Sequence, residues 1–175
     1  CESSTGWTLN GGTANWVLTT PTGTYSPAND NSAGGTKCFK TEAAGTAYGA
    51  IKTYILTSPT IDLTGYTGTS LSFYLWMNNE GTTSLYDGGF IEVYNGTSWV
   101  SATGSVAYDG SISSSYSNPY AATSAWTYDR TTWALVTVDI SAYDGVAGFK
   151  IRFKYGSDSS TGDGGCAVDD LTVTG

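Results

Sequence analysis

Two adjacent carboxylates near the end of the chain have a spacing and setting that suit metal ligands. Asp169 alternates with Leu171 and Val173 in the apolar segment 168–173, so we expect its side chain to point inward unless a bulge interrupts the strand. A carboxylate in the interior is costly unless it is paired, hydrogen-bonded or bound to a metal. Calcium takes about six to eight oxygen ligands and would satisfy Asp169, with Asp170 on the other face as the weaker candidate.

Paired acids could also hydrolyse glycosides, which needs two carboxyl groups about 5 Å or about 6.5–9.5 Å apart. Nothing in the sequence selects a pair among the acids that lie near aromatic residues. The chain has no histidine, which excludes a Ser-His-Asp triad, a Cys-His dyad and a histidine-ligated transition metal. We therefore predict a protein without catalytic residues. The acids considered are Asp87, Glu92, Asp109 and Asp129.

Aromatic rings on the solvent side of strands indicate a binding function more strongly. If the aliphatic residues that alternate with them face the core, these rings can stack on the apolar faces of sugars, and Glu92 can accept hydrogen bonds from hydroxyl groups. The rings could instead pair across strands or be covered by the irregular segment 103–130. That segment holds Tyr120 and Trp126 and is the second candidate binding region. The outward rings are Tyr74, Trp76, Phe90 and Tyr94.

Three of the seven basic residues, Lys150, Arg152 and Lys154, fall on one side of a single predicted strand. If that strand lies beside the strand of Tyr74 and Trp76, the shared face would suit a sulfated or carboxylated polysaccharide. The alternative is that these bases are cross-strand partners for the many acids of the chain.

Short alternating segments bounded by Gly, Asn, Asp or Pro must position these residues. About ten such segments occur, which predicts an all-β fold: an antiparallel β-sandwich of two packed sheets, with residues 1–175 forming a single jelly-roll domain. Asn95-Gly96 predicts a type I′ hairpin turn. Apolar residues at alternate positions in 71–77, 91–93, 134–140 and 151–155 predict the core.

The composition excludes several classes of partner. A net charge of −8 and a pI near 4.1 disfavour nucleic acid and anionic membrane surfaces, and no apolar run is long enough to be inserted in a membrane. Only 13% of residues are charged and 14% are aromatic, which is typical of a secreted β-protein. The chain begins at Cys1 without Met, so we expect a piece of a larger secreted multidomain protein. Its three cysteines allow one disulfide or three buried thiols.

The order of short motifs along the chain resembles that of a known group of domains. The motifs are Glu2, Gly6-Trp7, Asn15-Trp16, Asp30-Asn31-Ser32, Gly34-Gly35 and the segments 56–63, 71–73, 138–141, 151–153 and 168–171. Together they resemble the MAM-type jelly roll, the cleaved-adhesin domains of gingipain-type proteins, bacterial choice-of-anchor modules and the β-sandwich of immune-inhibitor-type metallopeptidases. The chain departs from the pattern at Cys166, where the bacterial group often has an aromatic residue. It also has three cysteines where animal MAM domains have four, so the disulfide map cannot be transferred.

The resemblance implies a calcium site and a non-catalytic role. In jelly rolls the first and last strands commonly lie side by side, which would bring Glu2 to Asp169, and the loop of Asp30 resembles the acidic loop of the group. We therefore predict a structural Ca²⁺ held by Glu2, Asp30 and Asp169, with Asp170 as a further candidate.

Two functions follow from these observations. The first is a secreted or cell-surface carbohydrate-binding module, appended to an extracellular enzyme or adhesin, that is a monomer and binds a glycan or an acidic polysaccharide. The alternative is a protein–protein adhesion domain or structural spacer of a cell-surface protein or secreted peptidase. The candidate ligand-binding residues are Tyr74, Trp76, Glu92, Tyr94, Tyr120, Trp126, Arg152 and Lys154.

Overall fold

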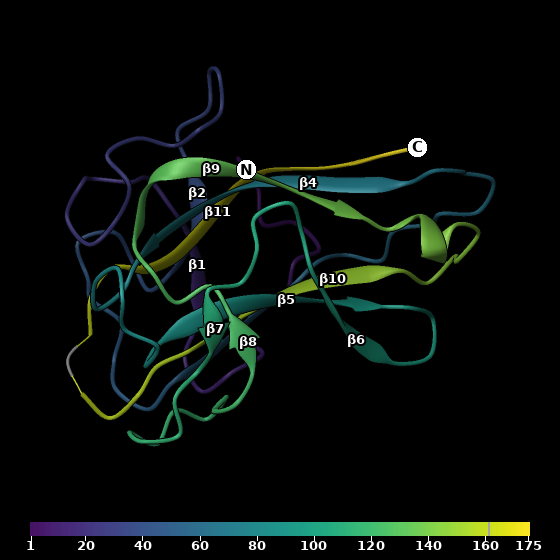
Figure 1. Cartoon of the computed structure of the whole chain (residues 1–175). Helices are drawn as coiled ribbons and strands as arrows, with labels where there is room; N and C mark the ends of the chain where they lie inside the picture. The colour runs from purple at the N-terminus through teal and green to yellow at the C-terminus, as the bar shows by residue number, and fades with distance from the viewer. Residues whose placement is uncertain (161) are drawn as a thin grey trace.

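Two antiparallel sheets pack face to face in the computed structural model of the protein. The structure describes residues 1–160 and 162–175. In Figure 1 the two sheets are the upper and lower layers, with a small hairpin in front of the lower layer. The five-stranded sheet has the order β1 (Trp16–Thr19), β2 (Cys38–Thr41), β11 (Gly165–Thr174), β4 (Ser70–Asn78), β9 (Arg130–Asp139). The four-stranded sheet has the order β3 (Thr53–Thr57), β10 (Lys150–Gly156), β5 (Gly88–Tyr94), β6 (Trp99–Ala102). The hairpin pairs β7 (Gly110–Ser111) with β8 (Ser124–Ala125), and the 3₁₀ turn η1 spans Ser141–Tyr143. The predicted β-sandwich is confirmed.

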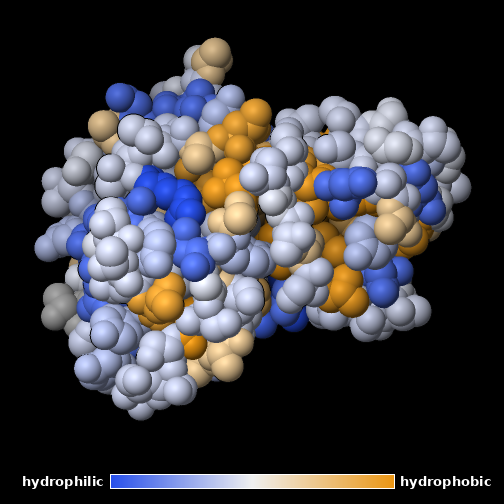
Figure 2. All heavy atoms as spheres, in the orientation of Figure 1, coloured by the Kyte–Doolittle hydropathy of each residue, from blue (hydrophilic) through white to orange (hydrophobic). Residues whose placement is uncertain are grey.

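The core lies between the two sheets and consists of the residues that the alternation pattern predicts. Each strand turns every second side chain inward, so β4 contributes a buried row of four apolar side chains and β10 a row of three. Aromatic rings fill the centre, where Phe73 packs edge-on against Phe153 at 4.9 Å between ring centroids. On the side drawn in Figure 2, hydrophobic surface gathers along the seam between the layers. The two rows are Leu71, Phe73, Leu75, Met77 and Ile151, Phe153, Tyr155.

Two expectations about neighbouring strands are wrong. The first and last strands are not adjacent, because β2 lies between β1 and β11. The N-terminal segment ahead of β1, rather than β1 itself, reaches β11: the amino group of Cys1 contacts Asp169. The basic strand β10 pairs with β3 and β5, whereas Tyr74 and Trp76 belong to β4 in the other sheet.

The β5–β6 hairpin is present, but its turn differs from the predicted one. Tyr94 pairs with Trp99, which leaves a four-residue loop over 95–98 instead of a two-residue type I′ turn. The Asn95 side chain accepts hydrogen bonds from Thr97 and Ser98 backbone N–H groups at 3.0 and 2.9 Å. Asparagine thus organises the loop through its side chain, while Gly96 supplies a positive φ of 94°.

The segment 103–130 carries the β7–β8 hairpin and covers part of the four-stranded sheet. Its Ile112 and Ala125 pack on Phe90, which is 3% exposed, so this predicted outward ring is covered. All three cysteines of the described chain are free thiols, Cys38 and Cys166 buried and Cys1 partly buried, so the alternative of one disulfide does not apply. None of the described helical structure is long or apolar enough to span a bilayer.

Candidate functional site

The outer face of the four-stranded sheet brings together aromatic and basic side chains from three neighbouring strands, β10, β5 and β6, and from a loop. We call it the aromatic–basic face and define it by Tyr94, Trp99, Tyr120, Lys150, Arg152 and Lys154. Cross-strand register builds it, because β10 places Lys150 opposite Tyr94, Arg152 opposite Glu92 and Lys154 opposite Phe90. The β5–β6 hairpin then places Trp99 opposite Tyr94, with 5.4 Å between the ring centroids. The chain is acidic as a whole, but this face carries more bases than acids.

Arg152 is held flat on this face by two kinds of contact. Its guanidinium donates to Glu92 Oε2 at 2.5 Å, and its Cζ lies 4.1 Å from the centre of the Trp99 ring. The pair is partly buried, with 21% of the Arg152 side chain and 16% of the Glu92 side chain exposed. A planar guanidinium stacked in this way keeps donors free at its edge, which suits carboxylate or sulfate groups of a partner.

Lys154 occupies the end of the face that the 103–130 segment covers. Its Nζ lies 4.4 Å from the centre of the Tyr120 ring and 5.1 Å from that of Phe90, and 3.7 Å from Glu92 Oε1. Burial lowers the pKa of Lys154, and the Glu92 carboxylate opposes that shift. Tyr120 therefore does belong to the site, as a ring that holds a lysine.

A wide groove adjoins the face on the side of β6. Its cavity volume is about 730 Å³, and its wall is made of small and hydroxylated side chains with one ring, Tyr108. Ser101 forms part of this wall and pairs with Glu92 in the sheet, so the groove is continuous with the aromatic–basic face. Its volume lies in the range of small-ligand sites.

Three of the predicted ligand-binding residues lie elsewhere. Trp126 is 1% exposed; it packs on Phe73 in the core and donates its ring N–H to the Val106 carbonyl, so it cannot meet a ligand. Trp76 faces outward from the five-stranded sheet as predicted, but it is 4% exposed because Trp133 covers it. Tyr74 lies on that same sheet, away from the bases of β10.

Trp99 was not among the predicted ligand-binding residues, although the sequence around it indicates that it faces outward. It follows the Asn-Gly turn at a distance that puts it on the same face as Glu92 for either a two-residue or a four-residue loop. Counting outward positions through the turn would have found it.

The predicted calcium ligands lie near the outer side of β11, where the strand is irregular: Glu2 and Asp30 approach each other at Gly35, and Asp169 and Asp170 contact Asn31 and Ser32. Among the described residues, no three of these four acids bring ligand atoms close enough together to hold one ion. A bulge between Asp169 and Thr172 shifts the register, and Asp170 has a positive φ of 48°. Asp169 pairs with the outward Tyr74, so it points away from the core, contrary to the alternation that we assumed. It is nevertheless fully buried, because the N-terminal segment and the loop around Asn31 cover it.

We call Glu2, Asp30, Asp169 and Asp170 the N-terminal acidic cluster. Its carboxylates differ in the hydrogen bonds that they accept. Asp169 accepts from the amino group of Cys1 and from the Asn31 backbone N–H, the latter at 2.9 Å. Glu2 Oε1 accepts from the backbone N–H groups of Thr36 and Lys37, and these bonds, led by that of Thr36, lower its pKa. Asp30 Oδ2 is buried and has no hydrogen-bond partner in the part of the chain that the structure describes.

The close approach of Glu2 and Asp30 depends on a glycine. A Cβ added at Gly35 would lie 2.5 Å from Glu2 Oε1 and 2.6 Å from Asp30 Oδ2, so only glycine leaves room for both carboxylates. Asp170 lies at the rim and accepts from Ser32 Oγ at 2.5 Å and from Asn31 Nδ2 at 3.0 Å.

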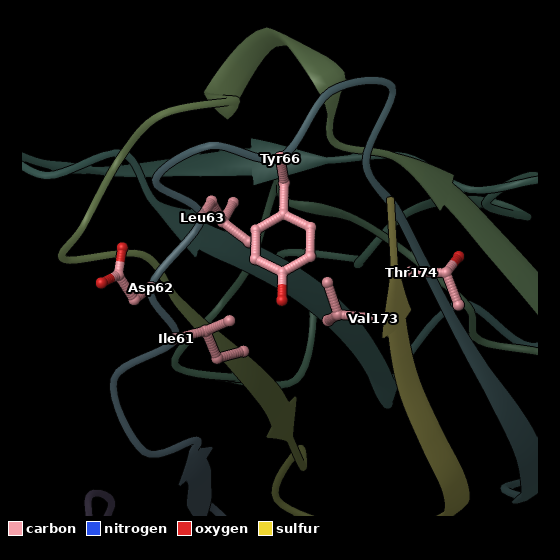
Figure 3. A pocket seen from close by; sticks show the side chains of 6 residues that line it. All are labelled: Ile61, Asp62, Leu63, Tyr66, Val173 and Thr174. Carbon is pink, nitrogen blue, oxygen red and sulfur yellow. The ribbon is translucent and has the colours of Figure 1, made fainter.

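A second, smaller cavity of about 110 Å³ lies near the C-terminal end of β11. Figure 3 shows the ring of Tyr66 extended between Leu63 and Val173, with Ile61 below. Tyr66 is 52% exposed, but the cavity is too small for a sugar ring with its hydroxyl groups. It does not contact the aromatic–basic face.

No family model and no curated protein matches this chain. Among solved structures, the K1 cleaved adhesin domain of Lys-gingipain from Porphyromonas gingivalis W83 is 14% identical, with a TM-score of 0.52 over 97% of this chain and 90% of that chain. The chain has a cleaved-adhesin-like fold. The K3 cleaved adhesin domain of the same protein is 15% identical over 97% and 91% of the two chains, with a TM-score of 0.44.

Proposed function

We propose that the chain is a non-catalytic adhesion module of a secreted or cell-surface protein, and that its aromatic–basic face binds an acidic protein surface. One observation carries this proposal: three of the seven basic residues of a chain with net charge −8 lie on one outer sheet face, beside Trp99 and Tyr94. Aromatic residues and arginine are the types enriched in protein interfaces.

The surroundings of the acids support a role without catalysis. Glu92 is bound by Arg152 and Lys154, and Asp109 forms a two-pronged pair with Arg130 at 2.6 and 2.9 Å. The hydrogen bonds from Arg130, Tyr128 and Thr127 outweigh burial and lower the pKa of Asp109, which makes it a poor general acid. The fold is also similar to that of a cleaved adhesin domain of Lys-gingipain, which favours the alternative, adhesion, over the carbohydrate binding that the sequence analysis put first.

Retention of a soluble polyanion by the immobilised protein tests the proposal. Poly-L-glutamate should be retained at about 50 mM salt and released at about 500 mM, because salt screens exposed charge pairs. Lys150→Glu should lower the affinity at least tenfold without unfolding, since Lys150 takes part in none of the described ion pairs. Lys52→Glu, which changes a base outside the face, is the matched control. Equal retention by the wild type and Lys150→Glu would overturn the proposal.

Carbohydrate binding is the second candidate function, and the hydroxyl-lined groove beside Ser101 is the observation that favours it. Heparin and a neutral xylan should then slow the protein in affinity electrophoresis. Trp99→Ala should abolish that effect, because the ring would supply the stacking surface next to the groove. Retardation by xylan together with no binding of poly-L-glutamate would favour this function over protein adhesion.

We also propose a structural calcium ion at the N-terminal acidic cluster. The unpartnered Asp30 Oδ2, facing Glu2 Oε1 across Gly35, fits a hard cation. Asp30→Asn should then weaken stabilisation by calcium, measured as the change in melting temperature after chelation.

A further inference from the structure

Three acids outside the N-terminal acidic cluster lie close together at one end of the sandwich. Glu80 follows β4, Asp87 immediately precedes β5, and Asp158 follows β10. The pairing of Gly156 with Gly88 aligns the ends of β10 and β5, and the Tyr155 hydroxyl donates to Asn79 Oδ1 at 2.7 Å, which joins the end of β4 to them. One carboxylate oxygen from each acid lies within 4.8 Å of the others. We call these three residues the strand-end acid cluster.

The cluster gathers three carboxyl groups without a basic partner among the described residues. The ion pairs of the described chain involve Asp109, Asp169 and Glu92 and none of the three acids. Asp87 is 2% exposed and Asp158 is 2% exposed, so water screens neither charge well. An arrangement of this kind is costly unless a cation neutralises it.

An unsatisfied oxygen provides independent evidence for a ligand. Asp158 Oδ2 is buried and has no hydrogen-bond partner among residues 1–160 and 162–175, whereas Oδ1 of the same carboxylate accepts from the Ser160 N–H at 2.7 Å. Asp158 and Glu80 both line a hollow of about 250 Å³, together with Tyr86, Tyr116 and Ser160. Buried carboxylate oxygens nearly always have a hydrogen-bond partner or a bound ion. The unpaired Asp158 Oδ2 beside this hollow therefore points to a ligand there.

The remaining contacts fix the carboxylates in place. Asp87 accepts from the Tyr48 hydroxyl at 2.5 Å and from the Asp158 backbone N–H at 2.6 Å, one bond to each oxygen. Glu80 Oε1 accepts from Ser160 Oγ at 2.9 Å. Each of these oxygens has a second lone pair that remains free for a cation.

We propose that the strand-end acid cluster is a calcium site, with Glu80, Asp87 and Asp158 as its carboxylate ligands and water completing the shell from the hollow. All the proposed ligand atoms are oxygens. This set disfavours zinc, which prefers the nitrogen and sulfur atoms of histidine and cysteine. Loop-borne carboxylates of differing exposure suit the irregular shell of Ca²⁺ better than the regular octahedron of Mg²⁺. The site ties the ends of β4, β5 and β10 together, and so links the two sheets.

Calcium titration of chelator-treated protein tests the site, read out by melting temperature and by Tb³⁺ luminescence. Tyr86 and Tyr116 line the hollow with 4.8 Å between their ring centroids, so excited tyrosine should sensitise bound Tb³⁺, and Ca²⁺ should displace it. Saturation with Ca²⁺, at about 100 times Kd, should raise the melting temperature by about 5–10 °C. The same concentration of Mg²⁺ should raise it less.

Two variants separate this site from the N-terminal acidic cluster. Glu80→Gln keeps the shape of a half-buried side chain and should weaken Ca²⁺ binding and abolish sensitised Tb³⁺ emission, while the apo protein keeps its melting temperature. Asp30→Asn is the matched control and should leave the Tb³⁺ emission unchanged. The proposal is overturned if Glu80→Gln responds to Ca²⁺ like the wild type, if Asp30→Asn alone removes the Tb³⁺ signal, or if Mg²⁺ acts as strongly as Ca²⁺.

Discussion

The carboxylate of Asp109 holds the two ends of the β7–β8 hairpin region together, between β6 and β9. Replacing Asp109 by Asn should therefore destabilise this region. Asp109 Oδ2 accepts from the backbone N–H groups of Thr127 and Tyr128 at 2.8 and 3.0 Å, and both oxygens accept from Arg130. Trp126, whose ring fills the core, directly precedes these residues. Asp109 therefore anchors the chain on either side of the β7–β8 hairpin.

The expected loss follows from the contacts that Asn cannot keep. An Asn amide oxygen can still accept one or two of these bonds, but the charge-assisted pair with Arg130 is lost. Hydrogen bonds to charged groups contribute about 1.5–3 kcal/mol. The pair is partly screened, with 19% of Arg130 and 8% of Asp109 side chain exposed, so we expect a loss of about 2 kcal/mol in the free energy of unfolding. For a domain of this length that corresponds to about 4–8 °C in melting temperature.

The same contacts predict how the effect depends on pH. Burial alone would raise the pKa of Asp109, but the hydrogen bonds from Arg130, Tyr128 and Thr127 outweigh it and hold the pKa below its ordinary value of 3.8. The folded state therefore binds this proton less readily than the unfolded state. The stabilisation is complete above that ordinary value and is lost as pH falls below it. The gap in melting temperature between wild type and Asp109→Asn should accordingly narrow below about pH 4.

Thermal unfolding of both proteins between pH 3 and pH 7, followed by near-ultraviolet circular dichroism, measures this gap. Asp62→Asn is the control, because Asp62 is exposed and its only described hydrogen bonds come from its neighbour Thr64. A melting temperature for Asp109→Asn equal to that of wild type at pH 7 would refute the reasoning. A gap that stays constant down to pH 3 would refute its electrostatic part.

Three further predictions rest on buried side chains. Trp126→Ala should destabilise the protein by about 3–5 kcal/mol in denaturant titration, because it empties a core position that is 1% exposed; a loss below 1 kcal/mol would show that the ring is not in the core. Burial lowers the pKa of Lys40 to about 8, so folding disfavours its protonated form; Lys40→Met should raise the melting temperature at pH 7, and this advantage should shrink as pH rises from 8 to 10. Ellman's reagent should titrate one thiol rapidly, that of Cys1, whereas Cys38 and Cys166 should react only after unfolding, since both are buried and burial raises the pKa of Cys38 to about 12.

The alternation of apolar residues was sufficient to predict the layers of this fold. Strands β4 and β10 have one buried face each, because a period of two assigns every side chain to a face before any pairing is known. The identity of neighbouring strands could not be obtained in this way. Consecutive strands pair in only part of the fold: β1 pairs with β2, β5 with β6 and β7 with β8, whereas β3 lies beside β10 and β11 inserts between β2 and β4.

Irregular backbone explains most of the errors at the candidate sites. The bulge after Asp169 reverses the face of that carboxylate, and no residue type in the segment signals it, since Asp170 adopts its positive φ without being glycine. Trp126 was misplaced, and the outward ring of Phe90 is covered, because the segment 103–130 folds back on the sheet, with the Gly89–Trp126 bridge as its anchor. A long segment of mixed polar and aromatic residues has no periodicity from which that docking could be predicted.

The outer faces of the two sheets differ in how exposed their side chains are, and this difference limits where a partner can bind. The outer side of the five-stranded sheet is largely covered: Lys40, Trp76 and Asp169 are each less than 5% exposed there. The four-stranded sheet keeps Trp99 and Arg152 half-buried and accessible, with a groove alongside. Because the strand-end acid cluster lies at the ends of β5 and β10, a cation there would stiffen the strands that carry the aromatic–basic face. Calcium should therefore change the affinity of that face for a polyanion only through rigidity, and Lys150→Glu should weaken polyanion binding equally with and without calcium.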